Sequence, residues 1–386
     1  MLLFIIDCLL ARWPRLGDPA TLANLTPRAA MAALASFVVA ILFGPRVIAW
    51  LKARYPEPIK SASADVMRLH ESKAATPTMG GMFIVGGAVV ATIFLGDWSN
   101  PYLPTTLLLL VALAVLGACD DLVKLTTEAR GLSARTKLLA QSAVALTAAV
   151  SIYRLHDGIA GGLALVVPFT DHAIELGWLF VPLATLVIVA SSNAVNLADG
   201  LDGLAGGCLV CATSAVAALV YACGHAGWAT HLNIPHIPSA GENLIVAAAV
   251  IGSLLGFLWF NCHPASVFMG NTGSLPLGGL LGLLAVIARQ ELLLLAIGGV
   301  FVAEAASVII QVVYFRWTNR RVFLCAPVHH HFQLKGWPED KIVVRFWIAG
   351  ALCAILGVGA LRGRTPRNVD LPADPMQVSS VQRIAR

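Results

Sequence analysis

Long apolar runs recur along the whole chain, and they restrict it to one kind of fold. Only 12% of the residues are charged, whereas soluble domains carry about 25%. A helix needs about 20 mostly apolar residues to cross a bilayer, and we expect ten runs to do so. They cover about 30–51, 80–97, 102–119, 136–154, 174–193, 203–223, 242–260, 274–289, 291–315 and 342–361. The sequence thus predicts an all-α, polytopic integral membrane protein with about ten transmembrane helices in a lipid bilayer.

The ends of the chain differ from these runs. The segment 1–28 is short and interrupted by Asp7, so we expect an interfacial helix rather than a span or a signal peptide. The segment 363–386 is polar and proline-containing, and we expect a disordered tail. No repeat or separate soluble domain is visible, so 1–386 is expected to be one transmembrane domain. Arg289-Gln290 alone separates the eighth run from the ninth, which makes that boundary the weakest.

The basic residues predict the orientation. Most of the 26 Lys and Arg residues lie in the loops after the odd-numbered runs, or at the edges of those loops. Loops rich in Lys and Arg stay in the cytoplasm, so we expect both termini outside. The same loops hold nearly all the polar motifs, which places one active site at the cytoplasmic face.

The stretch 193–203 is unusually polar for this chain. Amides and carboxylates recur there at every third position, as Asn193, Asn196, Asp199 and Asp202. A carboxylate at the bilayer centre costs roughly 3 kcal/mol, so the stretch indicates a functional site or a helix end at the water interface. Steps of three residues fan side chains around about half of a straight helix. Gly200 can break the helix and let Asp199 and Asp202 converge on a ligand or a cation.

Two other loops carry acidic and basic groups. Asp120 and Asp121 are adjacent, so on a helix they point about 100° apart. One can serve chemistry while the other holds a lysine; the plainer interpretation is a helix-end carboxylate paired with Lys124. The string HESKAATPTMGG brings Lys73 and Thr78 beside a glycine pair. That composition suits an anion such as a phosphate, and it equally suits a solvated loop before a capped helix.

The last two loops bring aromatic and imidazole side chains. His329, His330 and His331 are consecutive, and in an extended chain the first and third share one face. They suit a metal site, a phosphate clamp or a plain surface run; zinc is disfavoured there because no second Cys/His cluster has suitable spacing. Phe268 and Asn261 can stack on and hydrogen-bond a base, although packing is the commoner use of such residues.

These strings together resemble one family. In order they are GPRVIAWL, HESKAATPTMGG, Asp120-Asp121, NAVNLADGLDGLA, FNCHPASVFMGNTGSLPLGG and APVHHHFQLKGWPE, spread over about 44–350. The chain resembles the phospho-N-acetylmuramoyl-pentapeptide-transferases, within the polyprenyl-phosphate hexosamine-1-phosphate transferases. The resemblance implies transfer of phospho-MurNAc-pentapeptide from UDP-MurNAc-pentapeptide to undecaprenyl phosphate, forming lipid I and UMP. It also implies ten helices, Mg²⁺, a homodimer, the bacterial inner membrane and no nucleic-acid partner.

The resemblance also implies roles for residues of this sequence. The catalytic set is expected to be Asp120, Asp121, Asp199, His329, His330 and His331. Substrate contacts are expected from Lys73, Thr78, Lys137, Asn193, Asn196, Leu197, Gly200, Asp202, Asn261 and Phe268, with Phe268 stacking on uracil. Magnesium ligands are expected at Asp199 and Asn271. Asn271 is a departure, because the family usually has Asp there; the amide keeps an oxygen ligand and loses the charge. The plainer interpretation is a turn residue between Gly270 and Gly273.

Other functions fit less well. The nearest alternative is a sibling transferase that uses UDP-N-acetylhexosamine. A transporter would place its acids near mid-span at the interface of repeats, whereas here they gather at predicted helix ends. No His-Glu-x-x-His string or Walker A string occurs, which argues against an intramembrane metalloprotease and an ATP-driven pump.

The orientation can be tested in intact cells. We expect cysteines introduced at residues 60, 130 and 335 to be shielded from an impermeant thiol reagent until the membrane is opened, because all three lie in Lys/Arg-rich loops. Labelling of residue 130 from outside would rule out a single cytoplasmic site.

Overall fold

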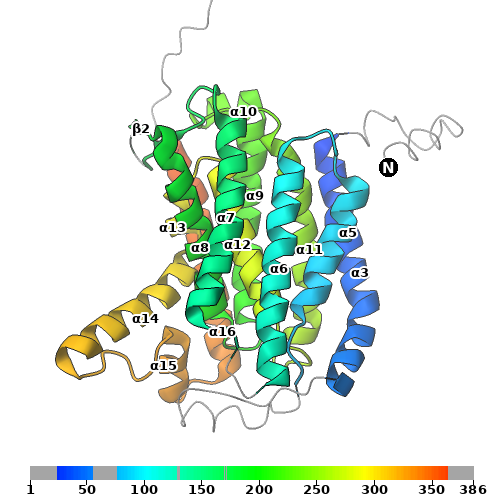
Figure 1. Cartoon of the computed structure of the whole chain (residues 1–386), viewed down its shortest axis with the longest axis vertical. Coiled ribbons are helices and arrows are strands. Elements are labelled where there is room, and N and C mark those ends of the chain that lie inside the picture. The colour runs from blue at the N-terminus through cyan, green and yellow to red at the C-terminus, as the bar shows by residue number, and fades with distance from the viewer. Residues whose placement is uncertain (1–23, 55–75, 128–130, 169, 171, 364–386) are drawn as a thin grey trace, which may run out of the picture.

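The computed structural model describes residues 24–54, 76–127, 131–168, 170 and 172–363, which form a helical bundle (Figure 1). Within these ranges, eight helical segments are long and apolar enough to cross a membrane. They are α3 (Leu25–Arg54), α6 (Tyr102–Thr126), α7 (Ala134–His156), η3 (Gly177–Leu179) with α8 (Phe180–Ala198), α9 (Leu204–Gly224), η4 (Ala240–Glu242) with α11 (Asn243–Asn261), α14 (Gly299–Thr318) and α16 (Glu339–Gly359). Two shorter apolar helices are α5 (Gly81–Leu95) and α12 (Asn271–Ile287).

These helices confirm a polytopic, mostly helical membrane protein, while the number of crossings stays a prediction. One correction concerns the class, because the loop after α7 contains two short strands. Strands β1 (Ala164–Val166) and β2 (Ala173–Glu175) pair antiparallel, with Ala164 opposite Glu175. Gly161 and Gly162 precede β1 in a turn, and glycine there disfavours continuation of a helix. The remaining short helices are α10 (Ala226–His231), α13 (Leu293–Ile297), α15 (Val328–Leu334) and η5 (Ala360–Gly363).

A second correction concerns the ninth run, 291–315, which we predicted as one helix. The structure breaks it at Gly298, so that α13 ends at Ile297 and α14 runs obliquely away from the bundle (Figure 1). The pair Gly298-Gly299 explains the break, because glycine is a poor helix former. The weak boundary at Arg289-Gln290 is confirmed as a turn between α12 and α13, where Arg289 has a φ of 57°.

Helix α12 is the centre of the bundle. All 17 of its residues are buried, as expected for a helix that is apolar on every side, and it packs against α6 and α8. Its glycines allow that close approach. A Cβ on Gly278 would lie 2.5 Å from the Ser191 carbonyl oxygen, and one on Gly279 would lie 2.3 Å from the Leu113 side chain.

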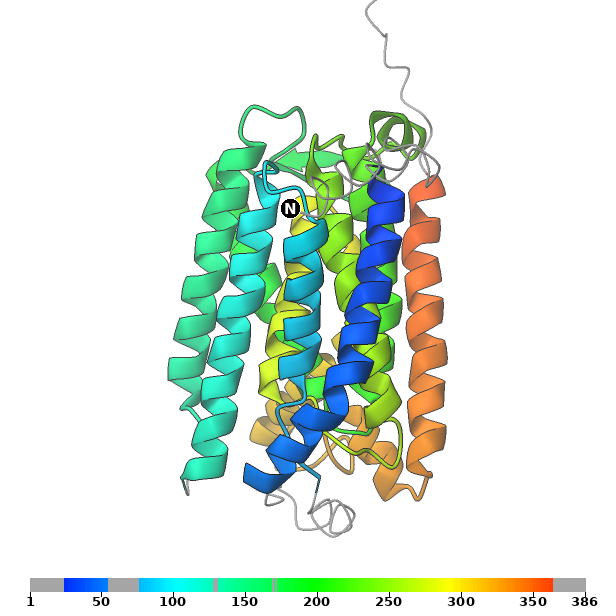
Figure 2. The same cartoon turned by 90° about the vertical axis from the view of Figure 1, so that its right-hand side faces the viewer.

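The two ends of the bundle differ in chemistry. The first turn of α3 and the last turn of α16 lie at one end, where Arg28 pairs with Glu242 and donates to the Leu95 carbonyl oxygen (Figure 2). The last turns of α6 and α8 meet the first turn of α12 at the opposite end. That second end collects the polar side chains that the sequence singled out.

Glycines at which two helices touch give a direct test of this arrangement, because a Cβ there would clash with the neighbouring helix. A Cβ on Gly252 of α11 would lie 1.9 Å from the Ala33 carbonyl oxygen of α3, whereas one on Gly86 of α5 meets nothing within 4 Å. We expect Gly252→Ala to destabilise the protein by about 1–3 kcal/mol through overpacking. Gly86→Ala is the matched control, and it should match or exceed the wild type in thermal unfolding in detergent. Equal melting temperatures for both variants would contradict the close α3–α11 contact.

Candidate active site

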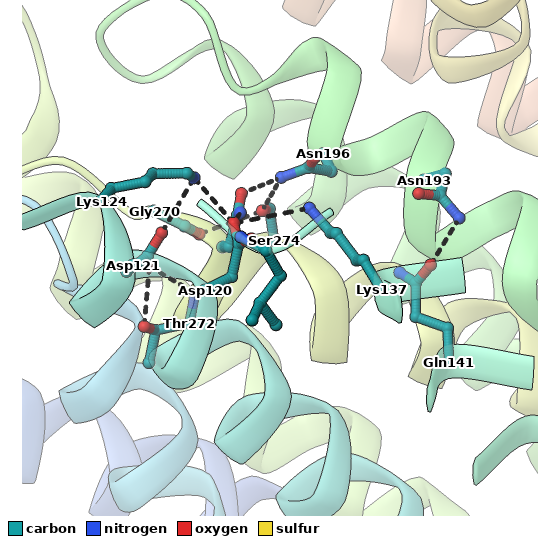
Figure 3. Close-up of polar contacts among 12 residues, drawn as sticks. Asp120, Asp121, Lys124, Lys137, Gln141, Asn193, Asn196, Gly270, Thr272 and Ser274 are labelled. Carbon is teal, nitrogen blue, oxygen red and sulfur yellow. Dashed lines mark hydrogen bonds and ion pairs between the residues drawn. The ribbon is translucent and has the colours of Figure 1, made fainter. Parts of the chain in front are cut away.

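The last turns of α6 and α8 and the first turn of α12 converge on the cluster of polar side chains shown in Figure 3. The last turns of α6 bring Asp120 and Asp121, and the start of α12 brings Asn271. The helices touch closely, because a Cβ on Gly117 would lie 2.1 Å from the Asn271 carbonyl oxygen. Gly270, just before α12, has a φ of 70°, a conformation that glycine adopts without strain.

Asp120 is buried and surrounded by donors. Lys124 Nζ lies 2.9 Å from its carboxylate and Lys137 Nζ lies 3.8 Å away. The Leu132 N–H donates to Asp120 Oδ1 at 2.8 Å, and the Asn271 side-chain N–H donates to Oδ2. A buried carboxylate is costly unless it is paired, so these donors offset its burial. Lys137, predicted to bind substrate, here faces Asp120 (Figure 3).

Asp121 has a different set of partners. The Thr272 backbone N–H donates to its Oδ2 at 2.9 Å and the Thr272 hydroxyl donates at 2.8 Å. Lys124 Nζ lies 3.3 Å from its other oxygen. The carboxylate therefore caps the positive end of the α12 dipole. Thr78 belongs to the same corner, because a Cβ on Gly270 would lie 2.7 Å from both the Thr78 hydroxyl and Asp121 Oδ2.

Asn196 links α8 to this cluster. Its side-chain N–H groups donate to Asn271 Oδ1 and, at 2.8 Å, to the Ser274 hydroxyl. Asn193, one turn earlier, points to α7 and donates to Gln141 Oε1 at 3.1 Å (Figure 3). The two amides thus diverge around α8, as the three-residue spacing predicts.

Gly200 follows the end of α8, as predicted. Helix α8 ends at Ala198 with Asp199 as its C-cap, and α9 starts at Leu204. A Cβ on Gly200 would lie 2.3 Å from His329 Nε2, so the imidazole packs directly against the turn. Leu197, another expected substrate contact, lies in the last turn of α8 and is half-buried.

The three histidines lie on α15, and the extended conformation that we considered for them is wrong. His329 is buried, with Nδ1 3.1 Å from Glu304 Oε2, and its Nε2 has no hydrogen-bond partner among the described residues. His330 Nδ1 lies 2.8 Å from Gln333 Oε1. His331 Nδ1 accepts from the Leu324 N–H at 3.1 Å. Partial burial lowers the pKa of His331, and the nearby Lys335 lowers it further.

Two of the expected substrate contacts, Asn261 and Phe268, form hydrogen bonds in or beside the loop after α11. Asn261 accepts from the Gly203 N–H at 2.9 Å and donates to the Val267 carbonyl oxygen at 2.8 Å. Phe268 is half-buried, and its backbone N–H donates to the Pro77 carbonyl oxygen at 2.8 Å. Lys73 lies outside the described residues.

A group that can hold a metal ion lies beside this loop. Asp202, His263 and Glu339 place one ligand atom each within 4.8 Å of one another. This group differs from the predicted magnesium ligands, Asp199 and Asn271. Neither His263 nor Glu339 stands out in the sequence as a candidate ligand.

Other partners in the cluster were also missed. They are Gln141, Thr272, Ser274 and Glu304. Glu304 gave a usable signal, because it is the one acid within the apolar run 291–315 after Glu291, and acids inside spans are commonly functional. Thr272 and Ser274 gave no comparable signal in the sequence, because threonine and serine also occur in ordinary turns.

Comparison with known proteins identifies the family of the chain. The model of the glycosyl transferase family 4 matches residues 103–289, which include Asp120, Asp199 and Asn271. A phospho-N-acetylmuramoyl-pentapeptide-transferase of Maridesulfovibrio salexigens is 42% identical over 344 residues, 88% of this chain and 94% of that protein. A protein of the same name from Campylobacter curvus is 43% identical over 344 residues, 88% of this chain and 96% of that protein. Since both alignments extend over nearly the whole chain, the protein belongs to the phospho-N-acetylmuramoyl-pentapeptide-transferase family.

Proposed function

We propose that the protein transfers phospho-MurNAc-pentapeptide from UDP-MurNAc-pentapeptide to undecaprenyl phosphate, which yields lipid I and UMP. One observation supports this reaction most strongly. The buried Asp120 carboxylate lies between two lysine ammonium groups at the N-terminus of the buried helix α12. Two lysines and a helix N-terminus attract a diphosphate, and the carboxylate supplies a base or a nucleophile.

The reaction must bring two anions together. A phosphate oxygen of the lipid carrier attacks the β-phosphorus, the bond to the UMP oxygen breaks, and UMP leaves. Lys124 and Lys137 sit where they can neutralise part of that charge once substrate draws them from Asp120. In a one-step route, Asp120 takes a proton from the lipid phosphate before that attack. In a two-step route, Asp120 attacks the β-phosphorus first and displaces UMP, and the lipid phosphate then displaces the carboxylate from the covalent intermediate. Both routes use the same carboxylate.

Magnesium is the cofactor that we propose for this site, with Asp199 and Asn271 as ligands. The donor set fits a hard cation, because Mg²⁺ prefers oxygen ligands. Asn271 Oδ1 accepts one hydrogen bond from Asn196 and has a second lone pair. Asp199 follows Asn196 by three residues at the end of α8. When bound, the ion would neutralise diphosphate charge.

We further propose a ten-helix, single-domain arrangement in the bacterial inner membrane, with the Asp120 cluster at the cytoplasmic face and homodimeric assembly. The start of α3 and the end of α16 lie at the same end of the bundle, opposite the cluster (Figure 2). Lys124 and Lys137 lie at the cluster's end, in agreement with the retention of basic residues on the cytoplasmic side.

A reconstituted assay tests the reaction. Purified protein, undecaprenyl phosphate and Mg²⁺ should release UMP from UDP-MurNAc-pentapeptide and form a lipid-linked product. UDP-GlcNAc should give neither. The reverse preference would assign the protein to the sibling hexosamine transferases.

Charge at the cluster should control turnover. We expect Asp120→Asn and Asp199→Asn to lower kcat by at least about 10²-fold, since each keeps volume and removes a charge that organises the reaction. Asp157→Asn, at the C-cap of α7, is the control and should keep wild-type kcat. Rates of UMP release decide the matter, and near-normal turnover would remove the substituted acid from the catalytic set.

The magnesium requirement should report on Asn271. An amide oxygen is a neutral ligand, so Asn271→Asp should reach half-maximal rate at a lower Mg²⁺ concentration than the wild type. Asn271→Ala removes the oxygen and should require the most. A single half-saturating concentration for all three proteins would mean that Asn271 serves only to hold Asp120 and Asn196.

A further inference from the structure

Glu304 is a buried acid that takes no part in the Asp120 cluster. It lies on α14, and its side chain is 0% exposed. Among the described residues its carboxylate has one partner, His329 on α15, whose Nδ1 lies 3.1 Å from Glu304 Oε2. The helices α14 and α15 pack together at the end of the bundle that holds the Asp120 cluster (Figure 1). A carboxylate buried among apolar helices is unfavourable without such a partner.

The hydrogen of this contact lies on the imidazole. A carboxylate is a weaker base than an imidazole, so Nδ1 of His329 donates and Glu304 accepts. The hydrogen bond made by one ring nitrogen of a histidine decides the state of the other. With the hydrogen on Nδ1, a neutral His329 keeps a lone pair on Nε2.

Nε2 of His329 faces the turn between α8 and α9. A Cβ on Gly200 would lie 2.3 Å from Nε2 and 2.8 Å from the neighbouring ring carbon Cε1, so a side chain at this position would displace the ring. Asp199, the C-cap of α8, immediately precedes that glycine. Contacts therefore run from Glu304 on α14 through His329 on α15 to the turn that carries Asp199.

Hydrogen-bonding capacity is left unused at both ends of this pair. Nε2 of His329 and the second carboxylate oxygen of Glu304, Oε1, are buried and have no hydrogen-bond partner among the described residues. Such atoms are unfavourable, and a catalytic role is one reason for which a protein retains them. A buried carboxylate that holds Nδ1–H and leaves Nε2 free is also the arrangement by which hydrolases orient a catalytic imidazole.

We propose that Glu304 is a positioning residue for His329. Its carboxylate keeps the hydrogen on Nδ1 and holds the ring so that Nε2 faces the turn that carries Asp199. Glu304 acts through the imidazole and does not contact the substrate. The proposal rests on the proposed function, in which His329 belongs to the catalytic set.

The position of the hydrogen can be measured without turnover. Full-length protein labelled with ¹⁵N-histidine is studied in lipid bilayers by solid-state NMR at about pH 8.5, well above the ordinary imidazole pKa. A ring nitrogen that carries hydrogen resonates apart from one that does not, and His329→Gln identifies the signals of His329 by their loss. We expect Nδ1 to carry hydrogen in the wild type and in Glu304→Asp. The amide of Glu304→Gln can either accept from Nδ1 or donate to it, so part of His329 should then carry its hydrogen on Nε2.

Turnover gives a second readout. Glu304→Gln should lower kcat by at least about 10-fold with little change in the KM for UDP-MurNAc-pentapeptide, because a misoriented imidazole impairs the transition state more than binding. Glu304→Asp keeps the carboxylate and should recover part of that loss. Glu291→Gln is the matched control and should keep wild-type kcat. Its carboxylate is also buried and paired, with Arg289, but it follows the end of α12 remote from the Asp120 cluster.

Three results would overturn the proposal. They are an Nδ1 without hydrogen in the wild type, an unchanged His329 signal in Glu304→Gln even where kcat falls, and an altered signal with wild-type kcat. In each case Glu304 would serve packing only. A wild-type protein that releases no UMP would instead contradict the proposed function, and the NMR comparison would still decide whether Glu304 sets the position of the hydrogen on His329.

Discussion

The burial of Asp120 and Asp121 is the constraint on which the rest of this site depends. Two adjacent carboxylates inside an apolar bundle are unfavourable unless donors surround them. The chain supplies Lys124 on the same helix, Lys137 on the next helix and, from the first turn of α12, the Asn271 side chain and the Thr272 backbone N–H. These donors come from separate segments, so neutralising the acids also fixes how α6, α7 and α12 pack. If one of these donors were removed, the remaining donors would not offset the cost of burying the two carboxylates.

The position of α12 follows from the same constraint. Its first turn contacts both acids, and every residue of α12 is buried. Glycines at its contacts with α6 and α8 let the backbones approach closely. The Asp120 cluster and the packing of the bundle therefore depend on the same helix: its glycines allow close packing, and its N-terminus contacts the acids.

Much of this could be predicted from the sequence, for identifiable reasons. The apolar runs are long and the acids interrupt them, so helix positions and the gathering of polar motifs at helix ends follow from the cost of charge in a bilayer. Gly200 ends α8 as the glycine predicts. The break at Gly298 was missed because the run is apolar on both sides of the glycine pair, and hydropathy does not report the direction of a helix. The hairpin of β1 and β2 was missed because three-residue strands lie below what alternation can reveal.

The sequence could not predict which neighbours each polar side chain contacts. Asn261 and Asp202, which are expected at the substrate, also form hydrogen bonds that join the α8–α9 turn to the loop 262–270. Asn193 likewise faces Gln141 on α7. Residue type shows that a side chain is polar and does not show which neighbour takes its hydrogen bonds, because those neighbours are distant in the chain. A substitution at Asn261 or Asp202 would therefore remove hydrogen bonds of the loop that carries Phe268, whereas Asp120 and Asn271 lie where the helix ends meet.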